Sequence, residues 1–411
     1  MASEQNTGQV IPTWIKASLF EPVFKEIFSN FQQIKDFQAK PALSAGENYA
    51  SIMLRLEAKI ELKDGSCKSK TLMLKTAHDN EMAKETLKNI DIFEVEHYMY
   101  REVVPEFEQI YTNAGVDIKF APKSYEIATE HSYLLLEDLK PKGYKNINRL
   151  EGFDIQHTHA VLKVLAQWHA ASAVLIAAKR NYKPVLFNNF FNEENREMMR
   201  NIYDKMTAIF LNCAKSYEGH ELYYERLCQH KDDIVDEMFE ANKQDEKEFN
   251  VLNHGDCWSN NVMFKYDELG NIVDTFLVDY QVPHIGTPAQ DLYYLLLSST
   301  RYELKIEKFD YFVKYYHDHL IKNLTLLKYP KKLPTLKDLH ITLHKYNAWA
   351  YNISIGVMAA VLLDPSENAK MENYLSDSDE AVQFKIQLYS NPRYRKHMEL
   401  VLPWLYYRGV F

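Results

Sequence analysis

The chain has 411 residues, 46% hydrophobic and 26% charged, so it has enough apolar surface to fold and exceeds the usual size of one hydrophobic core. A net charge of −9, from 48 Lys and Arg against 57 Asp and Glu, disfavours nucleic acid as a partner. The longest apolar stretches, such as residues 170–178, are too short to span a membrane. The polar N-terminus and four scattered cysteines favour a cytoplasmic protein, and no feature indicates an obligate protein partner.

Residues 46–139 are predicted to be rich in β-structure. Residues 51–62 and 67–76 are β-permissive and are joined by an Asp-Gly turn, which is typical of a β-hairpin. Residues 123–128 and 133–136 are predicted to form a second hairpin, because a short polar segment separates two apolar ones.

Helices dominate the rest of the prediction. Residues 80–104 are predicted to form a helix that ends at Pro105, because proline has no N–H to continue it. Amphipathic patterns predict further helices over 154–179, 194–217 and 223–241, a small hairpin of 262–264 with 275–278, and helices again from about residue 290. This change of pattern predicts a domain boundary near residue 140.

The richest set of chemically useful side chains lies in residues 251–264, where two strand-like segments enclose a loop of Asp, Asn and His. Asp256 and Asn261 lie in this loop, and Asp279 directly follows another apolar strand. A single Asp after a strand is usually a turn residue, but two carboxylates with an amide suit Mg²⁺, which prefers oxygen ligands.

These segments resemble the ecdysteroid kinase-like family, also called CHK kinase-like, which belongs with choline kinases and aminoglycoside phosphotransferases in the protein-kinase-like superfamily. Residues 252–261 read LNHGDCWSNN and resemble the family's H-G-D-x-W-x-x-N block with its metal-binding Asn. Residues 277–281 read LVDYQ and resemble its metal-binding D-[YF]-Q block. The resemblance implies that Asp256 is the catalytic residue, which accepts the proton of a substrate hydroxyl, and that Asn261 and Asp279 bind Mg²⁺.

The resemblance extends toward the N-terminus, over about residues 40–295 in all. It includes GENYAS at 46–51 as the nucleotide loop, a strand lysine, a helix glutamate that pairs with it, and LLLEDL at 134–139 as the hinge that holds adenine. It therefore implies an ATP site formed by Gly46, Asn48, Tyr49, Ala50, Ser51, Lys75, Glu96, Glu137, Asp138 and Leu139. His254 is predicted to support the loop backbone and Asp291 to brace the loop, and neither is predicted to be catalytic. No pair of glycines has the Walker or Rossmann spacing.

The implied fold class is α+β, a bilobal protein-kinase-like fold with a small β-rich N-lobe and a larger, mainly helical C-lobe. Residues 1–139 would form the N-lobe, with an N-terminal helical segment, the nucleotide-loop sheet and the Lys/Glu helix. Residues 140–411 would form the C-lobe, with the catalytic and metal-binding loops and the acceptor pocket.

The acceptor is predicted to be a small molecule, because the 12 positions between Asp279 and Asp291 leave no room for a protein-kinase activation loop. The family resemblance points to an ecdysteroid or another hydroxylated lipophile, including a xenobiotic. A choline- or ethanolamine-type kinase stays open, because Tyr346, Trp349 and Tyr351 could form an aromatic cage. A catalytically silent binding protein with the same fold is the competing class.

Overall fold

The computed structural model describes residues 11–42, 51–77, 92–187, 191–366 and 368–411. The chain forms two compact units, the first made of residues 1–88, 122–144 and 365–371 and the second of 89–121, 145–364 and 372–411. With 52% helix and 17% strand, a small antiparallel sheet near the N-terminus and a helical remainder, the predicted α+β bilobal kinase-like fold class is confirmed. The lobe boundary at residues 139 and 140 stays a prediction; the helical residues 92–113 belong to the second unit.

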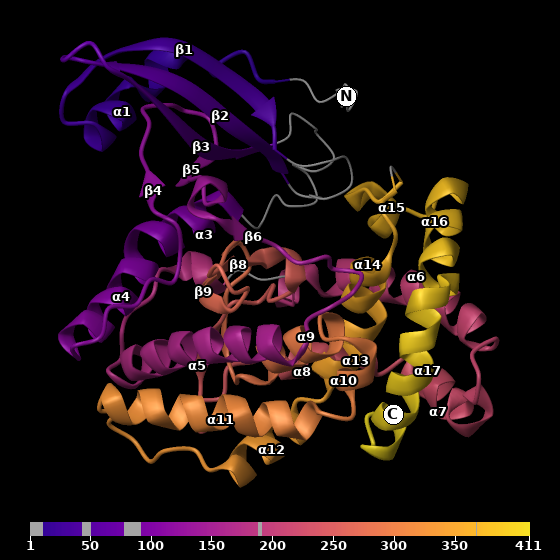
Figure 1. The fold of residues 1–411 in the computed structure, drawn as a ribbon. Coiled ribbons are helices and arrows are strands. Elements are labelled where there is room, and N and C mark those ends of the chain that lie inside the picture. Colours follow the sequence, from indigo (N-terminus) through magenta and orange to yellow (C-terminus); the bar gives the residue numbers. More distant parts are fainter. Residues whose placement is uncertain (1–10, 43–50, 78–91, 188–190, 367) are drawn as a thin grey trace. The chain divides into compact units, whose positions relative to one another are not determined.

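The first unit is built on a five-stranded antiparallel sheet with the order β1-β2-β3-β5-β4 (Figure 1). Its described elements are η1 (Ala17–Phe20), α1 (Glu21–Ile27), β1 (Phe31–Pro41), β2 (Ser51–Leu62), β3 (Cys67–Ala77), β4 (Ser124–Tyr125), β5 (Tyr133–Glu137) and η3 (Lys140–Lys142). Apolar side chains on one face of the sheet pack with Phe20 and Phe24 of the N-terminal helical segment into a single core. This core supports the strands that carry the predicted nucleotide-binding residues of the unit.

Both predicted hairpins of this unit are confirmed. β2 and β3 pair antiparallel from Ser51 opposite Ala77 to Glu61 opposite Cys67. At their turn Gly65 has a φ of +81°, which glycine adopts without strain, and Ser66 N–H donates to Asp64 Oδ1. β4 and β5 also pair antiparallel, although β4 is only two residues long.

The prediction that a helix ends at Pro105 is wrong. α3 (Ile92–Tyr98) continues through a π-helical turn, η2 (Met99–Val103), into α4 (Val104–Asn113). Pro105 lies in the first turn of α4, where the missing N–H and the fixed φ of proline are tolerated. The part of the predicted helix at residues 80–91 lies outside the described residues.

The second unit is mainly helical. Besides α3, η2 and α4, its described elements are β6 (Tyr144–Lys145, at the boundary of the units), α5 (Ile155–Ala177), η4 (Pro184–Phe187), η5 (Glu193–Asn195), α6 (Arg196–Ala214), η6 (His220–Leu222), α7 (Tyr224–His230), α8 (Ile234–Ala241), β7 (Val251–Asn253), η7 (Ser259–Asn261), β8 (Val262–Tyr266), β9 (Ile272–Leu277), β10 (His284–Gly286), α9 (Ala289–Ser298), α10 (Tyr302–Lys305), α11 (Phe309–Leu326), α12 (Leu336–Lys345), α13 (Ala348–Asn352), η8 (Ile353–Val357), α14 (Met358–Leu362), α15 (Met371–Leu375), α16 (Asp379–Ser390) and α17 (Pro392–Tyr407).

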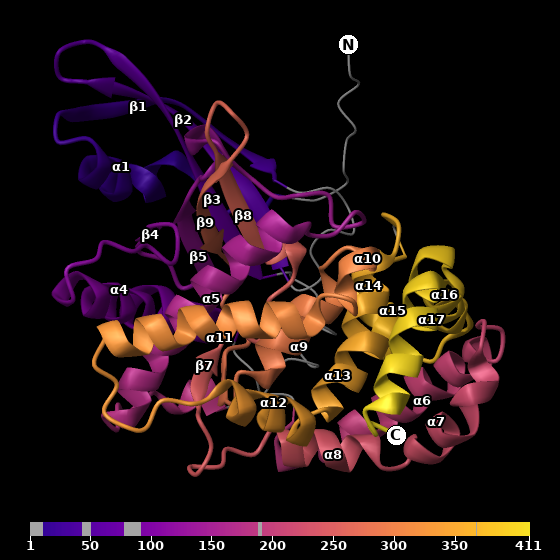
Figure 2. The ribbon, with the colours of Figure 1, turned by 60° about the horizontal axis from the view of Figure 1, so that its bottom comes forward.

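Helix α5 is the central helix of this unit, and α11 lies along it (Figure 2). Asp154 caps the start of α5, because its side chain accepts a hydrogen bond from His157 N–H. By length and composition α5 could cross a membrane, with a mean hydropathy of 1.5 in its most apolar window. However, 56% of that window is buried within the fold, as in the core helix of a folded domain.

Helix α5 also fixes the strand that leads into the predicted catalytic loop. Trp168 Nε1 donates to Leu252 O over 2.7 Å, and Leu252 N donates to Ser172 Oγ over 2.9 Å. On its other edge β7 pairs antiparallel with β10, from Asn253 opposite His284 to Val251 opposite Gly286. The strand is therefore held on both sides directly before the loop begins.

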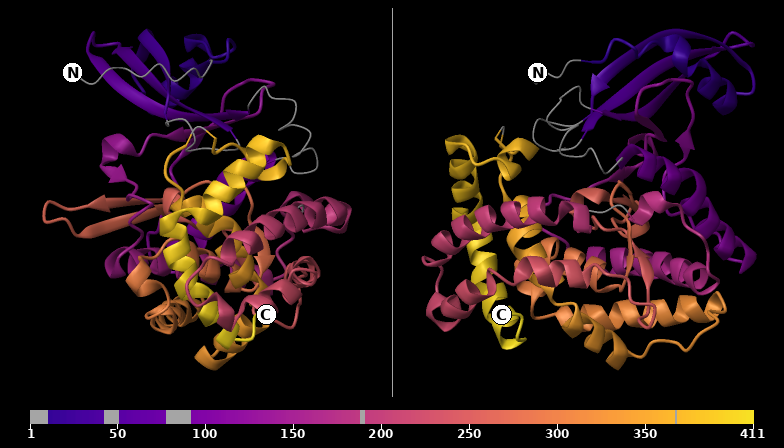
Figure 3. Two further views of the ribbon diagram at one scale, coloured as in Figure 1. Left: turned by 90° about the vertical axis from the view of Figure 1, so that its right-hand side faces the viewer. Right: turned by 180° about the vertical axis from the view of Figure 1, so that it is seen from behind.

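The predicted small hairpin is confirmed as β8 and β9, which pair antiparallel and project away from the helices around them (Figure 3). The predicted helices 154–179 and 194–217 correspond to α5 and α6. The single helix predicted over 223–241 is wrong, because residues 231–233 form a turn between α7 and α8. Asp232 and Asp233 lie in that turn, where short polar side chains compete with helical hydrogen bonds.

Candidate active site

The predicted catalytic loop connects β7 to β8 and makes a sharp turn at Gly255. This residue has a φ of +81°, in the left-handed region that favours glycine. A Cβ atom at this position would lie 1.9 Å from Val282 O, so the segment after Asp279 packs directly on the loop. Only glycine fits here, and it brings Asp256 and the segment around Asp279 close together.

The buried carboxylate of Asp291, near the start of α9, holds the loop backbone. Its Oδ2 accepts the N–H of His254 over 2.6 Å, and its Oδ1 accepts the N–H of Gly255 over 2.9 Å. His169 Nε2 lies 3.1 Å from the same Oδ2, and its Nδ1 lies 2.7 Å from Tyr316 OH. Burial alone would raise the pKa of Asp291, but the hydrogen bonds it accepts, first among them the one from His169, outweigh burial and lower it. The predicted bracing role of Asp291 is thus confirmed.

His254 also supports the backbone, as predicted. Its Nε2 lies 3.1 Å from the carbonyl oxygen of Val278, which can only accept, so Nε2 carries the proton. Its Nδ1 then accepts the N–H of Asp256 over 3.3 Å. Because both ring nitrogens are engaged with backbone groups, His254 has no lone pair left to take a proton from a substrate.

Asp256, Asn261 and Asp279, the three side chains predicted for catalysis and metal binding, lie in one cluster. Asn261 Nδ2 donates to the backbone oxygen of Asp256 over 3.0 Å and to its Oδ2 over 2.8 Å. Gln281 Nε2 lies 3.5 Å from Asp256 Oδ2 and 3.5 Å from Asp279 Oδ2, so it bridges the two carboxylates. The spacing in the sequence therefore predicted a real cluster.

The second oxygen of the Asp256 carboxylate has a different partner. Tyr294 OH, on α9, donates to Asp256 Oδ1 over 2.5 Å. Burial and the negative charge of Asp279 raise the pKa of Asp256, while the hydrogen bonds from Tyr294 and Asn261 act in the opposite direction. Burial and the nearby Asp256 raise the pKa of Tyr294 well above its ordinary value, so its hydroxyl stays protonated and acts as a donor.

The oxygen atoms of this cluster fit a magnesium ion. Both hydrogen bonds of Asn261 use its Nδ2, which leaves its Oδ1 for another partner. Gln281 Oε1 is buried and accepts no hydrogen bond from a described residue. Among the described residues no three His, Cys, Asp or Glu side chains are grouped to hold a metal. A site with few protein ligands suits Mg²⁺, which keeps waters and substrate phosphates in its shell.

Asp279 has a left-handed backbone conformation, with a φ of +70°. This conformation is unfavourable for a residue with a side chain and costs about 1–2 kcal/mol. Strained backbone persists where the surrounding structure imposes it, and such residues concentrate at functional sites. The strain at Asp279 is therefore an independent reason to regard this segment as functional.

The predicted nucleotide residues that the structure describes in the first unit lie on its central strands. Ser51 begins β2, and Lys75 lies in β3 opposite Met53 on one side and Leu134 on the other. Both side chains are buried. Glu96 lies on α3 of the second unit and is also buried. The pairing of Lys75 with Glu96 stays a prediction, and Gly46, Asn48, Tyr49 and Ala50 lie outside the described residues.

The predicted hinge residues follow β5. Glu137 ends this strand and accepts a hydrogen bond from Lys142 over 2.9 Å. Asp138 is bound by Arg55 Nε over 2.9 Å and accepts the N–H of Lys140, and Leu139 is buried. The side chain of Asp138 thus stabilises the first unit itself, and any contact of this segment with adenine stays a prediction.

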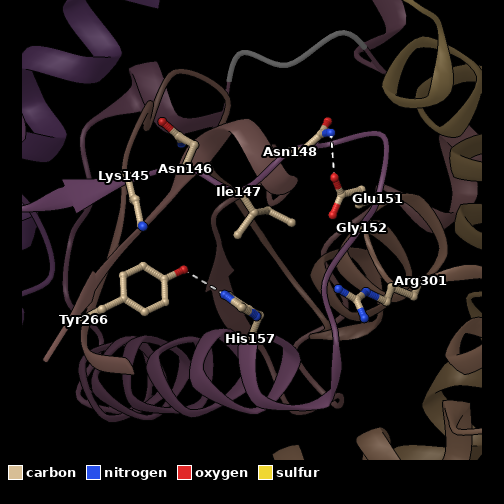
Figure 4. Close-up of a pocket in the computed structure, with 9 residues that line it drawn as sticks. All are labelled: Lys145, Asn146, Ile147, Asn148, Glu151, Gly152, His157, Tyr266 and Arg301. Carbon is tan, nitrogen blue, oxygen red and sulfur yellow. Dashed lines mark hydrogen bonds between the residues drawn. The ribbon is translucent and has the colours of Figure 1, made fainter. Parts of the chain in front are cut away.

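A separate cavity of about 310 Å³ lies between the start of α5 and the end of β8 (Figure 4). It is lined by Lys145, Asn146, Ile147, Asn148, Glu151, Gly152, His157, Tyr266 and Arg301. His157 Nε2 and Tyr266 OH are hydrogen-bonded over 2.8 Å, and His157 Nδ1 is 2.8 Å from Asp154 Oδ1. None of the residues predicted for catalysis, metal binding or nucleotide binding lines this cavity.

Sequence reasoning gave no role to two side chains of the cluster. Gln281 lies inside the quoted LVDYQ segment, but nothing in the spacing indicated that it bridges Asp256 and Asp279. Tyr294 lies three positions after Asp291 on α9 and so shares its helix face. This spacing of three residues could have pointed to Tyr294. It indicates a contact with the loop only once Asp291 is known to face the loop.

Two comparisons with known proteins bear on this site. The family model described as the ecdysteroid kinase-like family matches residues 45–329, which is more than half of the chain and includes the whole cluster around Asp256. A comparison with curated proteins found no match.

Proposed function

Because the chain belongs to the ecdysteroid kinase-like family, we propose that it is a phosphotransferase that uses ATP and Mg²⁺ to phosphorylate a hydroxyl of a small lipophilic molecule. The observation that carries the proposal is the cluster of Asp256, Asn261 and Asp279 on a loop whose backbone is fixed by Asp291. Phosphoryl transfer requires mainly that a protein position the reactants and stabilise charge, and this cluster suits both tasks.

In the proposed reaction Asp256 acts on the acceptor. The acceptor oxygen forms a bond to the γ-phosphorus, the bond from that phosphorus to the bridging oxygen breaks, and its electron pair leaves with ADP. The acceptor proton passes to the carboxylate of Asp256, which is held in place by Asn261, Gln281 and Tyr294. The raised pKa of Asp256 makes it a better proton acceptor than an ordinary exposed carboxylate.

Asn261 Oδ1 and the Asp279 carboxylate would hold the metal ion. When bound, Mg²⁺ would neutralise negative charge on the phosphates. In the nucleotide part of the proposal Lys75 binds phosphate and pairs with Glu96, the loop of Gly46, Asn48, Tyr49, Ala50 and Ser51 covers the phosphates, and the segment of Glu137, Asp138 and Leu139 binds adenine. The family resemblance supports that part.

An ecdysteroid or a hydroxylated xenobiotic is the proposed acceptor, with hormone inactivation or detoxification as the corresponding role. The family description supports an ecdysteroid as the acceptor. Tyr346, Trp349 and Tyr351, which could line either an aromatic cage or a sterol pocket, are all buried, so their exposure favours neither acceptor class over the other. We also propose a cytoplasmic location, which the four free cysteines support.

The acceptor is tested by incubating the protein with γ-labelled ATP, Mg²⁺ and a panel of ecdysteroids, hydroxylated plant toxins, choline and ethanolamine. Phosphate should appear on a lipophilic alcohol of the panel. Labelling of choline or ethanolamine would instead support the alternative kinase class. Calorimetric titration with Mg²⁺-ATP tests the silent-binder alternative, because a protein that binds no nucleotide cannot be this enzyme.

Asp256→Asn tests the catalytic assignment. The variant should lose roughly 10²- to 10⁴-fold in turnover, the usual contribution of a general base. Its affinity for Mg²⁺-ATP should stay close to that of the wild type. Asp267→Asn is the matched control, because it makes the same change at an exposed turn of the β8–β9 hairpin. Equal turnover in the Asp256 variant and the control would refute the role of Asp256.

A further inference from the structure

The two oxygens of the Asp256 carboxylate are distinguished by their partners. Oδ2 faces Asn261 Nδ2 at 2.8 Å and Gln281 Nε2 at 3.5 Å. Among the described residues Oδ1 accepts one hydrogen bond, from Tyr294 OH at 2.5 Å. Each carboxylate oxygen can accept two hydrogen bonds, so Oδ1 keeps a free lone pair. Under the proposed function, on which this inference rests, Oδ1 is therefore the oxygen that receives the acceptor hydroxyl.

Tyr294 reaches Oδ1 from a helix that is already fixed to the loop. Asp291 and Tyr294 lie three residues apart on α9, and one binds the loop backbone while the other binds the loop's carboxylate. Helices α13 and η8 pack against α9, so Tyr294 belongs to a well-supported element. We propose that Tyr294 is a positioning residue, whose hydroxyl holds Oδ1 of Asp256 in the orientation that accepts the acceptor hydroxyl.

This role has a specific kinetic consequence. Without the Tyr294 hydroxyl the carboxylate keeps its one hydrogen bond from Asn261, at Oδ2, but Oδ1 is no longer held, so the acceptor meets a less well-oriented base. A hydrogen bond to a charged group and the alignment of reacting atoms each contribute strongly to a reaction rate, and together predict a loss of roughly tenfold to a hundredfold in kcat. Binding of Mg²⁺-ATP does not use Oδ1 and should not change.

The test compares Tyr294→Phe with Tyr293→Phe, which removes the same hydroxyl from the neighbouring residue of α9. Tyr293 OH donates to Leu343 O over 2.7 Å, away from Asp256, so this variant reports the general effect of losing a buried hydroxyl. Thermal midpoint, Mg²⁺-ATP affinity, and kcat and KM are measured for both variants. ATP hydrolysis, with water as the acceptor, serves as the assay until a preferred acceptor is known.

The expected result is a fall in kcat for Tyr294→Phe alone, with the KM for ATP and the thermal midpoint close to those of Tyr293→Phe. Three outcomes would overturn the proposal: wild-type or higher turnover in Tyr294→Phe, an equal fall in both variants, or a loss of folding in Tyr294→Phe alone. A wild-type protein that binds no Mg²⁺-ATP would overturn the proposed function and this inference together. Nucleotide binding with unchanged kcat in Tyr294→Phe would overturn this inference alone.

Discussion

Asp291 and Lys305 are both fully buried ionisable residues of the second unit, but their surroundings differ. The carboxylate of Asp291 faces three donors, namely the N–H groups of His254 and Gly255 and the Nε2 of His169. Among the residues that the structure describes, the amine of Lys305 donates to a single acceptor, Leu297 O. The donors around Asp291 lower its pKa despite burial, so it stays charged, whereas burial lowers the pKa of Lys305 to about 7.

This difference shows how the fold uses buried polar groups. A buried charge is retained where several hydrogen bonds replace water, and then it fixes the geometry of the groups that bind it. At the candidate active site that geometry is the backbone of the loop that carries Asp256. Around Lys305 the neighbours do not complete such a network; the nearby His397 has no partner for its Nδ1 among the described residues, and burial lowers its pKa to about 2.

Replacing Asp291, whose carboxylate accepts several hydrogen bonds, should have the largest effect on stability. Asp291→Ala would leave two backbone N–H groups and His169 buried without their acceptor, so we expect a loss of about 3–5 kcal/mol in the free energy of unfolding. Turnover should fall even where the variant is still folded, because the loop loses its brace. Urea unfolding monitored by tryptophan fluorescence measures the loss.

Asp318→Ala is the control for this variant. Asp318 is an exposed carboxylate on α11, paired with Lys314, and its removal should change stability by less than about 1 kcal/mol. A loss of similar size in the two variants would contradict the view that the partners of Asp291 matter.

Displacing the loop backbone should have the next largest effect. Gly255→Ala places a Cβ atom 1.9 Å from Val282 O and forces alanine into a φ of +81°, so we expect a loss of about 3 kcal/mol or more and a large fall in turnover. Gly270→Ala is the matched control. Gly270 has nearly the same φ, +82°, but no atom lies near its Cβ position, so only the conformational cost of about 1 kcal/mol should remain. Thermal unfolding of the two variants separates the clash from the strain.

Removing the amine of Lys305 should have a smaller effect on stability, and this effect should depend on pH. The pKa of Lys305 is about 7 in the folded protein and near its ordinary, higher value in the unfolded chain. Between these values the unfolded chain binds a proton that the folded protein lacks, so this lysine makes stability fall as the pH falls from 10 to 7. Lys305→Met removes that dependence, so its gain over the wild type should be largest near pH 7, at least about 1 kcal/mol, and small near pH 10.

Thermal unfolding at pH 7 and pH 10 tests this expectation. Lys314→Met, on the exposed face of α11, provides the control, because its effect should be the same at both pH values. If the difference in stability between the Lys305 variant and the wild type were the same at both pH values, the amine would stay charged in the folded protein.

The sequence predicted local features well where one segment carried the whole signal. The hairpin of β2 and β3 followed from its Asp-Gly turn, and the cluster of Asp256 with Asn261 followed from spacing within one loop. The strand β1 was missed because it lies at the edge of the sheet, and its many Gln, Lys and Asp side chains hide the alternation. The helix end assigned to Pro105 failed because proline is also compatible with a first helical turn.

The remaining features depend on contacts between distant segments. The hydrogen bond from Tyr294 to Asp256 joins residues 38 positions apart, and the approach of Val282 O to Gly255 depends on how two loops pack. The left-handed φ of Asp279 likewise could not be read from the sequence, because aspartate adopts that conformation only occasionally. These are the details that decide how the reactive groups are oriented.

Relieving the backbone strain at Asp279 should have the smallest effect on stability. It tests whether the candidate active site is optimised for stability alone. Asp279→Gly relieves a φ of +70° and removes a negative charge that raises the pKa of Asp256, so we expect a gain of up to about 1 kcal/mol in the free energy of unfolding. Turnover should nevertheless be lost, together with Mg²⁺-dependent nucleotide binding, because the carboxylate is gone. Lys328→Gly is the matched control, since Lys328 has a similar φ of +56° at the end of α11 and is exposed. It should gain similar stability with unchanged turnover, whereas a loss of stability in Asp279→Gly would mean that the interactions of the carboxylate outweigh the strain of its backbone.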